Sequence, residues 1–204
     1  MMSAAPTGTP TRQRVSASER RDALIAAAVH EFARGGLHGT PVDKIARRVG
    51  VAQPYVFSLF GSKKELFLAA VERGFVSVAD TFTGAAAEFG PDDVLEDADV
   101  LHAMGASYLR LLHSDRDFLM LQHQAYAACD DPEIRDRVRA LYAGLVAHVE
   151  RLAADAAQRL GQEPPGPERV DEFFRYGMWM NVAAAMGVED LSAGCDWVRA
   201  EGNK

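Results

Sequence analysis

Cysteine is scarce in this 204-residue chain, which has only Cys129 and Cys195. Two thiols so far apart match no metal-ligand spacing and build no disulfide framework, so we expect structural thiols in a reducing compartment. Long hydrophobic runs are also missing. No stretch approaches the 18 or so apolar residues that cross a bilayer, and residues 1–14 lack the apolar core of a signal peptide. These absences predict a soluble cytoplasmic protein with no membrane partner.

The motifs that catalysis and phosphate or metal binding usually require are absent as well. The sequence contains no GxSxG nucleophile elbow, no glycine-rich phosphate loop ahead of a strand, and no HExxH or paired Cys/His cluster. The acidic group around Asp92-Asp93, Glu96-Asp97 and Asp99 is interpreted as exposed charge at a loop and a helix start. We therefore expect no enzyme activity, no metal ion and no cofactor.

The chain as a whole lacks an excess of positive charge, since its 22 basic and 29 acidic residues give a net charge of −7. This average combines two unlike parts. Residues 1–75 contain eleven basic and six acidic residues, a net charge of +5, whereas residues 76–204 carry −12. A basic N-terminal part is typical of a surface that contacts nucleic acid, so DNA is a candidate partner despite the acidic total.

What the sequence does have is helical periodicity, without any run of period-two alternation, and this predicts an all-α protein. Residues 1–15 read as a flexible basic arm. A first helix is expected from Ser16, where Ser16 and Glu19 can form a capping box, to a stop at Gly35-Gly36. A long helix should open with Ser62 and Glu65 and run to about Phe82. Further helices are expected at about 94–113, 115–129, 132–161 and 167–188, with a short one near 190–201.

Two short amphipathic helices joined by a tight turn at Gly50 occupy the segment between Thr40 and Phe60. In the first, Thr40 and Asp43 are expected to form a capping box, and one apolar stripe is predicted for Val42, Ile45, Ala46 and Val49. The second should pack Val56, Leu59 and Phe60 inward. This arrangement fits a helix-turn-helix, although spacing alone equally fits part of an ordinary helical bundle.

The outward face of the second short helix would then carry Gln53, Tyr55 and Ser58. Glutamine can pair with adenine, serine can contact several bases, and tyrosine can reach a phosphate or a thymine methyl group. Phosphate anchors are expected at helix N-termini, where unpaired amides attract anions, and on nearby polar and cationic side chains. These are Thr40, Lys44, Arg47, Arg48 and Lys63.

A known family shares this combination of residues. Residues 20–75 resemble the tetracycline-repressor (TetR) family of bacterial transcription regulators, through Arg20-Arg21-Asp22-Ala23-Leu24-Ile25-Ala26-Ala27-Ala28, Phe32, Gly36, Thr40, Ile45-Ala46, Gly50-Val51 and Phe60-Gly61-Ser62-Lys63-Lys64-Glu65-Leu66. The resemblance covers a little over a quarter of the chain. It implies a three-helix helix-turn-helix DNA-binding domain at residues 16–61, a divergent helical effector-binding and dimerisation domain at residues 62–204, and a homodimer on a palindromic operator.

Some positions depart from the family pattern. Ala52 stands where the family usually has serine, Phe57 where it has a phosphate-contacting tyrosine, and Leu59 where an aromatic residue is frequent. Two phosphate hydroxyls are therefore missing, so Tyr55, Lys63 and the arm are expected to contribute more affinity. The candidate DNA-binding residues are Thr40, Lys44, Arg48, Gln53, Pro54, Tyr55, Phe57, Ser58 and Lys63.

The acidic body beyond residue 90 shows a segment, Asp171 to Val188, that is apolar on most faces. A helix of this kind is buried on more than one side, against its own core and against a two-fold mate, or else within the core of a monomer. Polar and aromatic groups inside apolar helices suggest a small-molecule cavity, although packing explains each of them individually as well. The candidate ligand-binding residues are His102, Tyr108, Phe118, Gln122, His123, Tyr126, Met178 and Trp179.

These observations predict a ligand-responsive transcriptional regulator, a repressor that binds double-stranded operator DNA as a homodimer and is released by a small, largely apolar effector. Two alternatives stay open. One is a helical small-molecule-binding protein without operator recognition, and the other is an enzyme that uses the apolar cavity.

Overall fold

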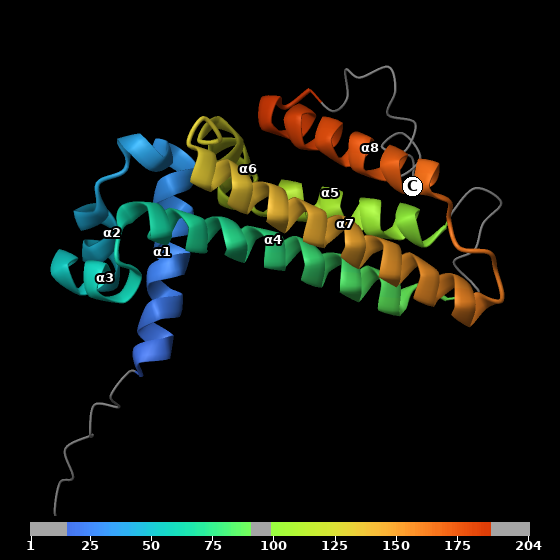
Figure 1. Cartoon of the computed structure of the whole chain (residues 1–204), viewed down its shortest axis with the longest axis horizontal. Helices are drawn as coiled ribbons and strands as arrows, with labels where there is room; N and C mark the ends of the chain where they lie inside the picture. The colour runs from blue at the N-terminus through green and yellow to red at the C-terminus, as the bar shows by residue number, and fades with distance from the viewer. Residues whose placement is uncertain (1–15, 91–98, 189–204) are drawn as a thin grey trace, which may run out of the picture.

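The computed structural model describes residues 16–90 and 99–188, and in these ranges the chain is helical with no strand (Figure 1). The all-α prediction is confirmed. No helix of these two ranges has the length and apolar character needed to cross a membrane. The predicted arm at 1–15, the acidic residues from 92 to 97 and the predicted helix at 190–201 lie outside the described residues. The helices are α1 (Ala17–Gly39), α2 (Val42–Val49), α3 (Gln53–Phe60), α4 (Lys63–Glu88), α5 (Val100–Ser114), α6 (Arg116–Ala127), α7 (Pro132–Leu160) and α8 (Pro167–Met186).

Helices α1 to α3 form a head at one end of the molecule, and α4 leads away from it into the body (Figure 1). The head's core is made of fully buried side chains such as Leu24 and Ile45, and the Phe32 and Phe67 rings meet edge to face at 5.1 Å. The same core continues into α6 and α7 through Leu121 and other buried side chains. Burial of this apolar surface fixes the head against the body.

The body consists of α5 to α8 packed with the distal part of α4 around a second core that includes Phe82, Leu101 and Met180. Helix α4 continues beyond the predicted end at Phe82 because the alanine-rich stretch that follows is a strong helix former. Helix α5 begins later than predicted, with Asp99 as its N-cap residue.

Several predicted helix ends are confirmed. Ser16 and Glu19 form the full capping box, and the Ser62 hydroxyl accepts a hydrogen bond from the Glu65 amide at 3.0 Å. Gly50 ends α2 in the left-handed region with φ of 73°. At Gly36, φ of 60° and ψ of −176° break the helical path of α1 where a stop was predicted, and a further turn leads on to Gly39.

The predicted capping box at the start of α2 is wrong. Pro41 is the N-cap residue, and no side chain caps this helix. The Thr40 side chain is buried and its hydroxyl donates instead to the Glu31 carbonyl oxygen at 3.1 Å, while Asp43 pairs with Arg47 at 2.8 Å. A tertiary acceptor on α1 thus outcompetes the local amide for the threonine hydroxyl.

Candidate nucleic-acid interface and ligand cavity

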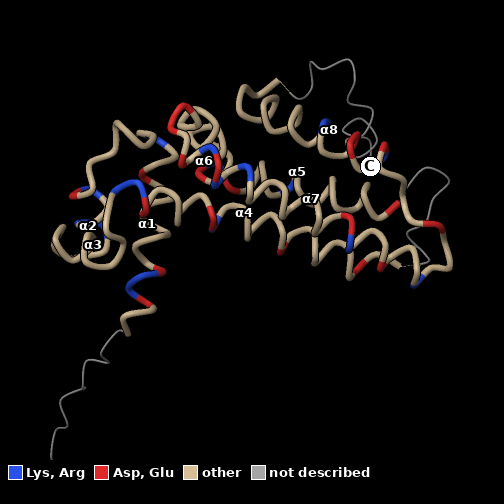
Figure 2. The backbone as a smooth tube through the Cα atoms, in the orientation of Figure 1, with Lys and Arg blue, Asp and Glu red and all other residues tan. Residues whose placement is uncertain are grey.

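Helix α3 presents a solvent-exposed face without any charged residue. Gln53, Pro54, Phe57 and Ser58 are exposed, whereas Val56 and Phe60 are buried in the head's core, as predicted. Figure 2 shows α3 free of the blue and red that mark charge elsewhere on the head. Any base reading by α3 would therefore use amide, hydroxyl and apolar contacts, since no arginine or lysine lies on it.

The placement predicted for Tyr55 needs correction, because its side chain is half-buried and packs against the head's core. It contributes less to the outward face than Gln53 does. The Ser58 hydroxyl donates to the Tyr55 carbonyl oxygen at 2.8 Å, which fixes its orientation in the absence of another partner.

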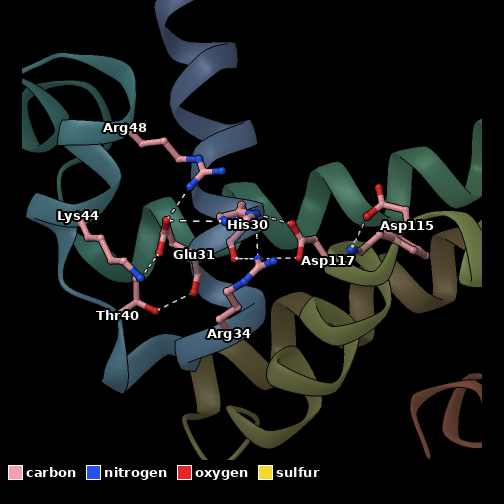
Figure 3. Close-up of polar contacts among 9 residues, drawn as sticks. His30, Glu31, Arg34, Thr40, Lys44, Arg48, Asp115 and Asp117 are labelled. Atoms are coloured by element: carbon pink, nitrogen blue, oxygen red, sulfur yellow. Dashed lines mark hydrogen bonds and ion pairs between the residues drawn. The ribbon is translucent and has the colours of Figure 1, made fainter. Parts of the chain in front are cut away.

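A buried carboxylate holds two of the predicted phosphate anchors. Glu31 of α1 is only 4% exposed and pairs with Lys44 at 2.7 Å and Arg48 at 3.1 Å, both from α2 (Figure 3). The hydrogen bond from Lys44 lowers the pKa of Glu31 against the opposing effect of its burial. Both cations keep about half of their surface exposed. They lie at the solvent edge of the head with their direction set by Glu31.

Two other predicted anchors are engaged within the protein. The Lys63 ammonium donates to the His38 carbonyl oxygen at 3.1 Å, and burial lowers the pKa of Lys63. Thr40 is 2% exposed, so the predicted phosphate contact of its hydroxyl is not supported by its position. Of these two, only Lys63 retains partial exposure.

One turn of α1 connects the head to the body. Next to Glu31, the His30 Nδ1 atom lies 2.5 Å from Asp117 of α6, and Arg34 donates to the other oxygen of Asp117 at 2.6 Å (Figure 3). At Gly36, a Cβ atom would lie 2.5 Å from the Gln124 Oε1 atom of α6, so the two helices are in close contact there. Two successive residues of α1 thus contact different parts of the protein: Glu31 pairs with the cations of α2, and His30 pairs with Asp117 of α6.

Lys64 makes a second link between the two parts. Its ammonium pairs with Asp131 at 2.7 Å and with Glu133 at 2.8 Å, both at the start of α7. The hydrogen bonds to these carboxylates raise the pKa of Lys64. The first turn of α4 is therefore attached to α7 as well as to the head.

An apolar cavity of about 60 Å³ lies in the body, lined by α4, α5, α6, α7 and α8. It brings together five of the eight predicted ligand-binding residues, Tyr108, Phe118, Gln122, Tyr126 and Met178. The sequence did not indicate the aromatic residues that complete its wall, because their spacing on amphipathic helices is that of ordinary core residues. These include Phe75, Phe82, Tyr142, Phe173, Phe174 and Tyr176.

Three predicted ligand-binding residues do not line this cavity. His102 lies in the first turn of α5, beside the N-cap. His123 follows Gln122 by one residue and so points about 100° away around α6, with its Nε2 atom 3.4 Å from the Asn181 carbonyl oxygen. Trp179 is 44% exposed on the outer face of α8.

A polar network crosses the cavity wall. The Asn181 amide donates to the Tyr108 hydroxyl at 3.0 Å, and the hydroxyls of Tyr108 and Tyr126 donate to Gln122 Oε1 at 3.1 and 3.4 Å. Burial raises the pKa of both tyrosines, so both stay protonated donors. Within the two described ranges, Gln122 Nε2 and Asn181 Oδ1 have no hydrogen-bond partner. The Gln122 amide thus leaves a free donor beside an apolar space.

Comparisons with known proteins agree with this architecture. Residues 24–70 match the family described as bacterial regulatory proteins, tetR family. The HTH-type transcriptional activator FasR of Mycolicibacterium smegmatis is 42% identical over 60 residues, covering 29% of this chain and 27% of FasR. The HTH-type transcriptional repressor SCO4008 of Streptomyces coelicolor is 33% identical over 92 residues, covering 44% of this chain and 45% of that one. The chain therefore matches less than half the length of these two curated relatives.

A solved structure is similar over nearly the whole chain. It is the transcriptional regulator FadR from Bacillus subtilis in complex with stearoyl-CoA, with a TM-score of 0.63 and 16% sequence identity. The match covers 90% of this chain and 89% of FadR. At this identity, the likeness shows a shared fold.

Proposed function

We propose that this chain, whose residues 24–70 match the family described as bacterial regulatory proteins, tetR family, is a ligand-responsive, DNA-binding transcriptional regulator. It is proposed to act in the cytoplasm, with residues 16–61 as the DNA-binding domain and residues 62–204 as the effector and dimerisation domain. The observation that carries the proposal is the exposed, uncharged face of α3, which a buried core supports and cations on α2 and α4 flank. Such a helix suits the major groove, while the cations suit phosphates.

Base reading is assigned to Gln53, Phe57 and Ser58. Glutamine can accept from and donate to adenine, and an exposed phenyl ring can contact a thymine methyl group. Phe57, which is 37% exposed, then contributes an apolar contact in place of a phosphate-binding hydroxyl. Phosphate contacts are assigned to Lys44, Arg48 and Lys63.

We propose a homodimer formed through α8. Its outer face exposes Met178, Trp179, Val182 and Met186, with 37% to 59% of each side chain accessible. Three of these residues recur every four positions, so they form one apolar stripe along the helix. A two-fold dimer would bury this stripe against itself and present two heads to successive major grooves, about 34 to 36 Å apart.

The effector is proposed to be a small, largely apolar molecule that enters the body cavity. The similarly folded FadR was solved in complex with stearoyl-CoA, and the acyl chain of that ligand supports an occupant with an apolar part. A cavity of about 60 Å³ is far smaller than the roughly 300 to 1,000 Å³ of typical ligand sites. The walls must therefore move when the effector binds. Because this movement would change the placement of the heads, we propose that the effector lowers operator affinity and that the protein represses transcription.

The test is a titration of the full-length protein with DNA from the region upstream of its own gene. A specific regulator gives a footprint of two half-sites and an affinity that falls steeply with salt. Gln53→Ala should lower the discrimination between operator and mutated operator by about 1 to 3 kcal/mol, whereas Gln158→Ala, exposed near the end of α7, serves as the matched control. Binding that is independent of sequence, or no binding, would favour a small-molecule-binding protein without operator recognition.

The dimer has its own test. Val182→Glu places a charge in the centre of the apolar stripe and should shift the protein to a monomer in light scattering, with loss of operator affinity. A variant that remains dimeric and binds DNA normally would place the interface elsewhere.

A further inference from the structure

A second hollow lies directly outside the cavity. It is an open groove of about 450 Å³ between α4 and α7. Phe75 of α4 and Leu145 of α7 line both the cavity and the groove, and both side chains are half-buried. These two side chains therefore form a shared wall between an enclosed apolar space and an open one.

Helices α4 and α7 lie side by side and run in the same direction (Figure 1). Glu72 contacts Arg137, and Thr83 contacts His148, so both pairs are separated by 65 residues along the sequence. Between these cross-contacts the helices contribute small apolar residues, among them Ala79, Ala140 and Gly144. A narrow apolar floor results, with polar residues at each end.

The two ends of the groove differ in charge. At the end near the head, Glu72 accepts a hydrogen bond from Arg137 Nε at 2.7 Å, so this pair is electrically balanced. At the other end lies Arg151, which has no carboxylate within ion-pair distance among residues 16–90 and 99–188. The groove therefore has one net positive end.

The position of Arg151 is set by a chain of hydrogen bonds. The Thr83 hydroxyl donates its hydrogen to the Ala79 carbonyl oxygen at 2.8 Å, so toward His148 Nε2, at 2.9 Å, it acts as the acceptor. The other ring nitrogen of His148 is then free to accept from Arg151 Nη2, at 3.3 Å. Arg151 is thus oriented by a hydrogen bond and not by a carboxylate, so its charge remains available. It lies six residues, about 9 Å along the helix, beyond Leu145.

We propose that the groove and the cavity together form one site for an elongated amphipathic anion, an aliphatic chain with a terminal carboxylate. The inference rests on the proposed function and names the chemical class of the effector. The carboxylate binds Arg151, whose planar guanidinium matches it with paired hydrogen bonds. The chain crosses the groove floor, passes between Phe75 and Leu145, and ends in the cavity. A narrow chain suits this path because the cavity alone is too small for a compact ligand.

The proposal is tested by calorimetric titration of the full-length protein with two probes, decanoate and 1-decanol. The alcohol has the same chain length and a neutral end. Decanoate should bind at least roughly tenfold more tightly than 1-decanol, because a charge-assisted hydrogen bond is about that much stronger than a neutral one. Arg151→Gln should lower decanoate affinity to the level of 1-decanol and leave the alcohol unaffected. Arg139→Gln, on an exposed part of α7 outside the groove, is the matched control and should change neither.

A second variant blocks the floor. An added Cβ at Gly144 meets no atom within 4 Å, and leucine is a better helix former than glycine, so Gly144→Leu should fold normally. Its side chain would occupy the groove and should weaken decanoate and 1-decanol alike by roughly tenfold or more.

The inference is overturned if decanoate and 1-decanol bind equally well, if Arg151→Gln leaves decanoate affinity unchanged, or if Gly144→Leu binds both probes normally. Operator titration of the same preparations separates this outcome from the proposed function. Protein that binds operator DNA but neither probe overturns the effector class alone, whereas protein that binds decanoate but no operator overturns the regulator.

Discussion

Replacement of Gly36 by alanine tests how tightly the head is joined to the body. Gly36 has φ of 60° and ψ of −176°, a backbone region that is essentially restricted to glycine. Forcing alanine into such a region costs about 1 to 3 kcal/mol. In addition, the new Cβ would lie 2.5 Å from Gln124 Oε1 and 3.3 Å from its Cδ. This side chain can rotate, at a cost of up to about 1 kcal/mol. We therefore expect Gly36→Ala to lower the free energy of unfolding by about 1 to 4 kcal/mol.

The assay is urea unfolding of the full-length protein at one fixed concentration, since a dimer's stability depends on concentration. Gly39→Ala is the matched control, because it lies three residues further on, has no positive φ, and its added Cβ meets no atom within 4 Å. It should change stability by less than about 1 kcal/mol. In a Gln124→Ala background, the destabilisation caused by Gly36→Ala should lose only the contribution of the clash with Gln124, and the contribution of the backbone conformation should remain.

Two results would refute this reasoning. If Gly36→Ala costs no more than Gly39→Ala, the backbone at Gly36 is not constrained as described. If Gln124→Ala fully restores the stability of Gly36→Ala, the cost is a side-chain clash and not a backbone conformation.

Three further predictions concern buried and half-buried polar groups. Because Lys44 lowers the pKa of Glu31 in the folded state, the carboxylate stabilises the fold above its ordinary pKa of 4.5 and loses this effect as the pH falls through the lowered value. The destabilisation by Glu31→Gln should therefore be present at pH 7 and shrink below about pH 4.5 in denaturation curves; a difference that does not vary with pH would contradict the ion pairs. Asp117→Asn should cost about 1 kcal/mol and speed hydrogen exchange in α1 about fivefold, and unchanged exchange would argue against the link to α6. Asn181→Leu should change the free energy of unfolding by less than about 1 kcal/mol, since the side-chain oxygen of Asn181 has no partner to lose. Tyr108→Phe should cost about 1 to 3 kcal/mol, because it removes the hydroxyl that both Asn181 and Gln122 contact. Equal costs for the two variants would count against the network.

Local features of the fold were predictable from the sequence because their partners are close in the chain. The Ser16 capping box and the left-handed turn at Gly50 depend on residues within four positions and are observed as expected. Thr40 failed for the opposite reason. Its sequence context matches an N-cap of α2, but the acceptor that it uses belongs to Glu31, nine residues earlier in the preceding helix α1.

The same distinction applies to the candidate sites. Amphipathic periodicity predicts which face of α3 turns inward, and the buried Val56 and Phe60 confirm it. It does not say which inward faces leave a space between them. Phe173 and Tyr142 have the pattern of core residues, and their role in the cavity wall follows from helices that meet across 30 or more residues of sequence. The charge of Glu31 likewise gave no sign that it would be buried between α1 and α2.

Helix α6 explains how events in the cavity could reach the DNA-reading head under the proposed function. Gln122 and Tyr126 line the cavity from one side of this helix, whereas Gln124, two residues and about 200° further around, touches Gly36 of α1. A helix of 12 residues is about 18 Å long and moves as a unit. Gln124 contacts Gly36, and Asp117 of the same helix pairs with His30 and Arg34, so a shift of α6 would be transmitted to α1 through these contacts. The change in operator affinity can then be no larger than the difference between the effector's affinities for the two states. By linkage, operator DNA must change the affinity for the effector by the same factor as the effector changes the affinity for the operator.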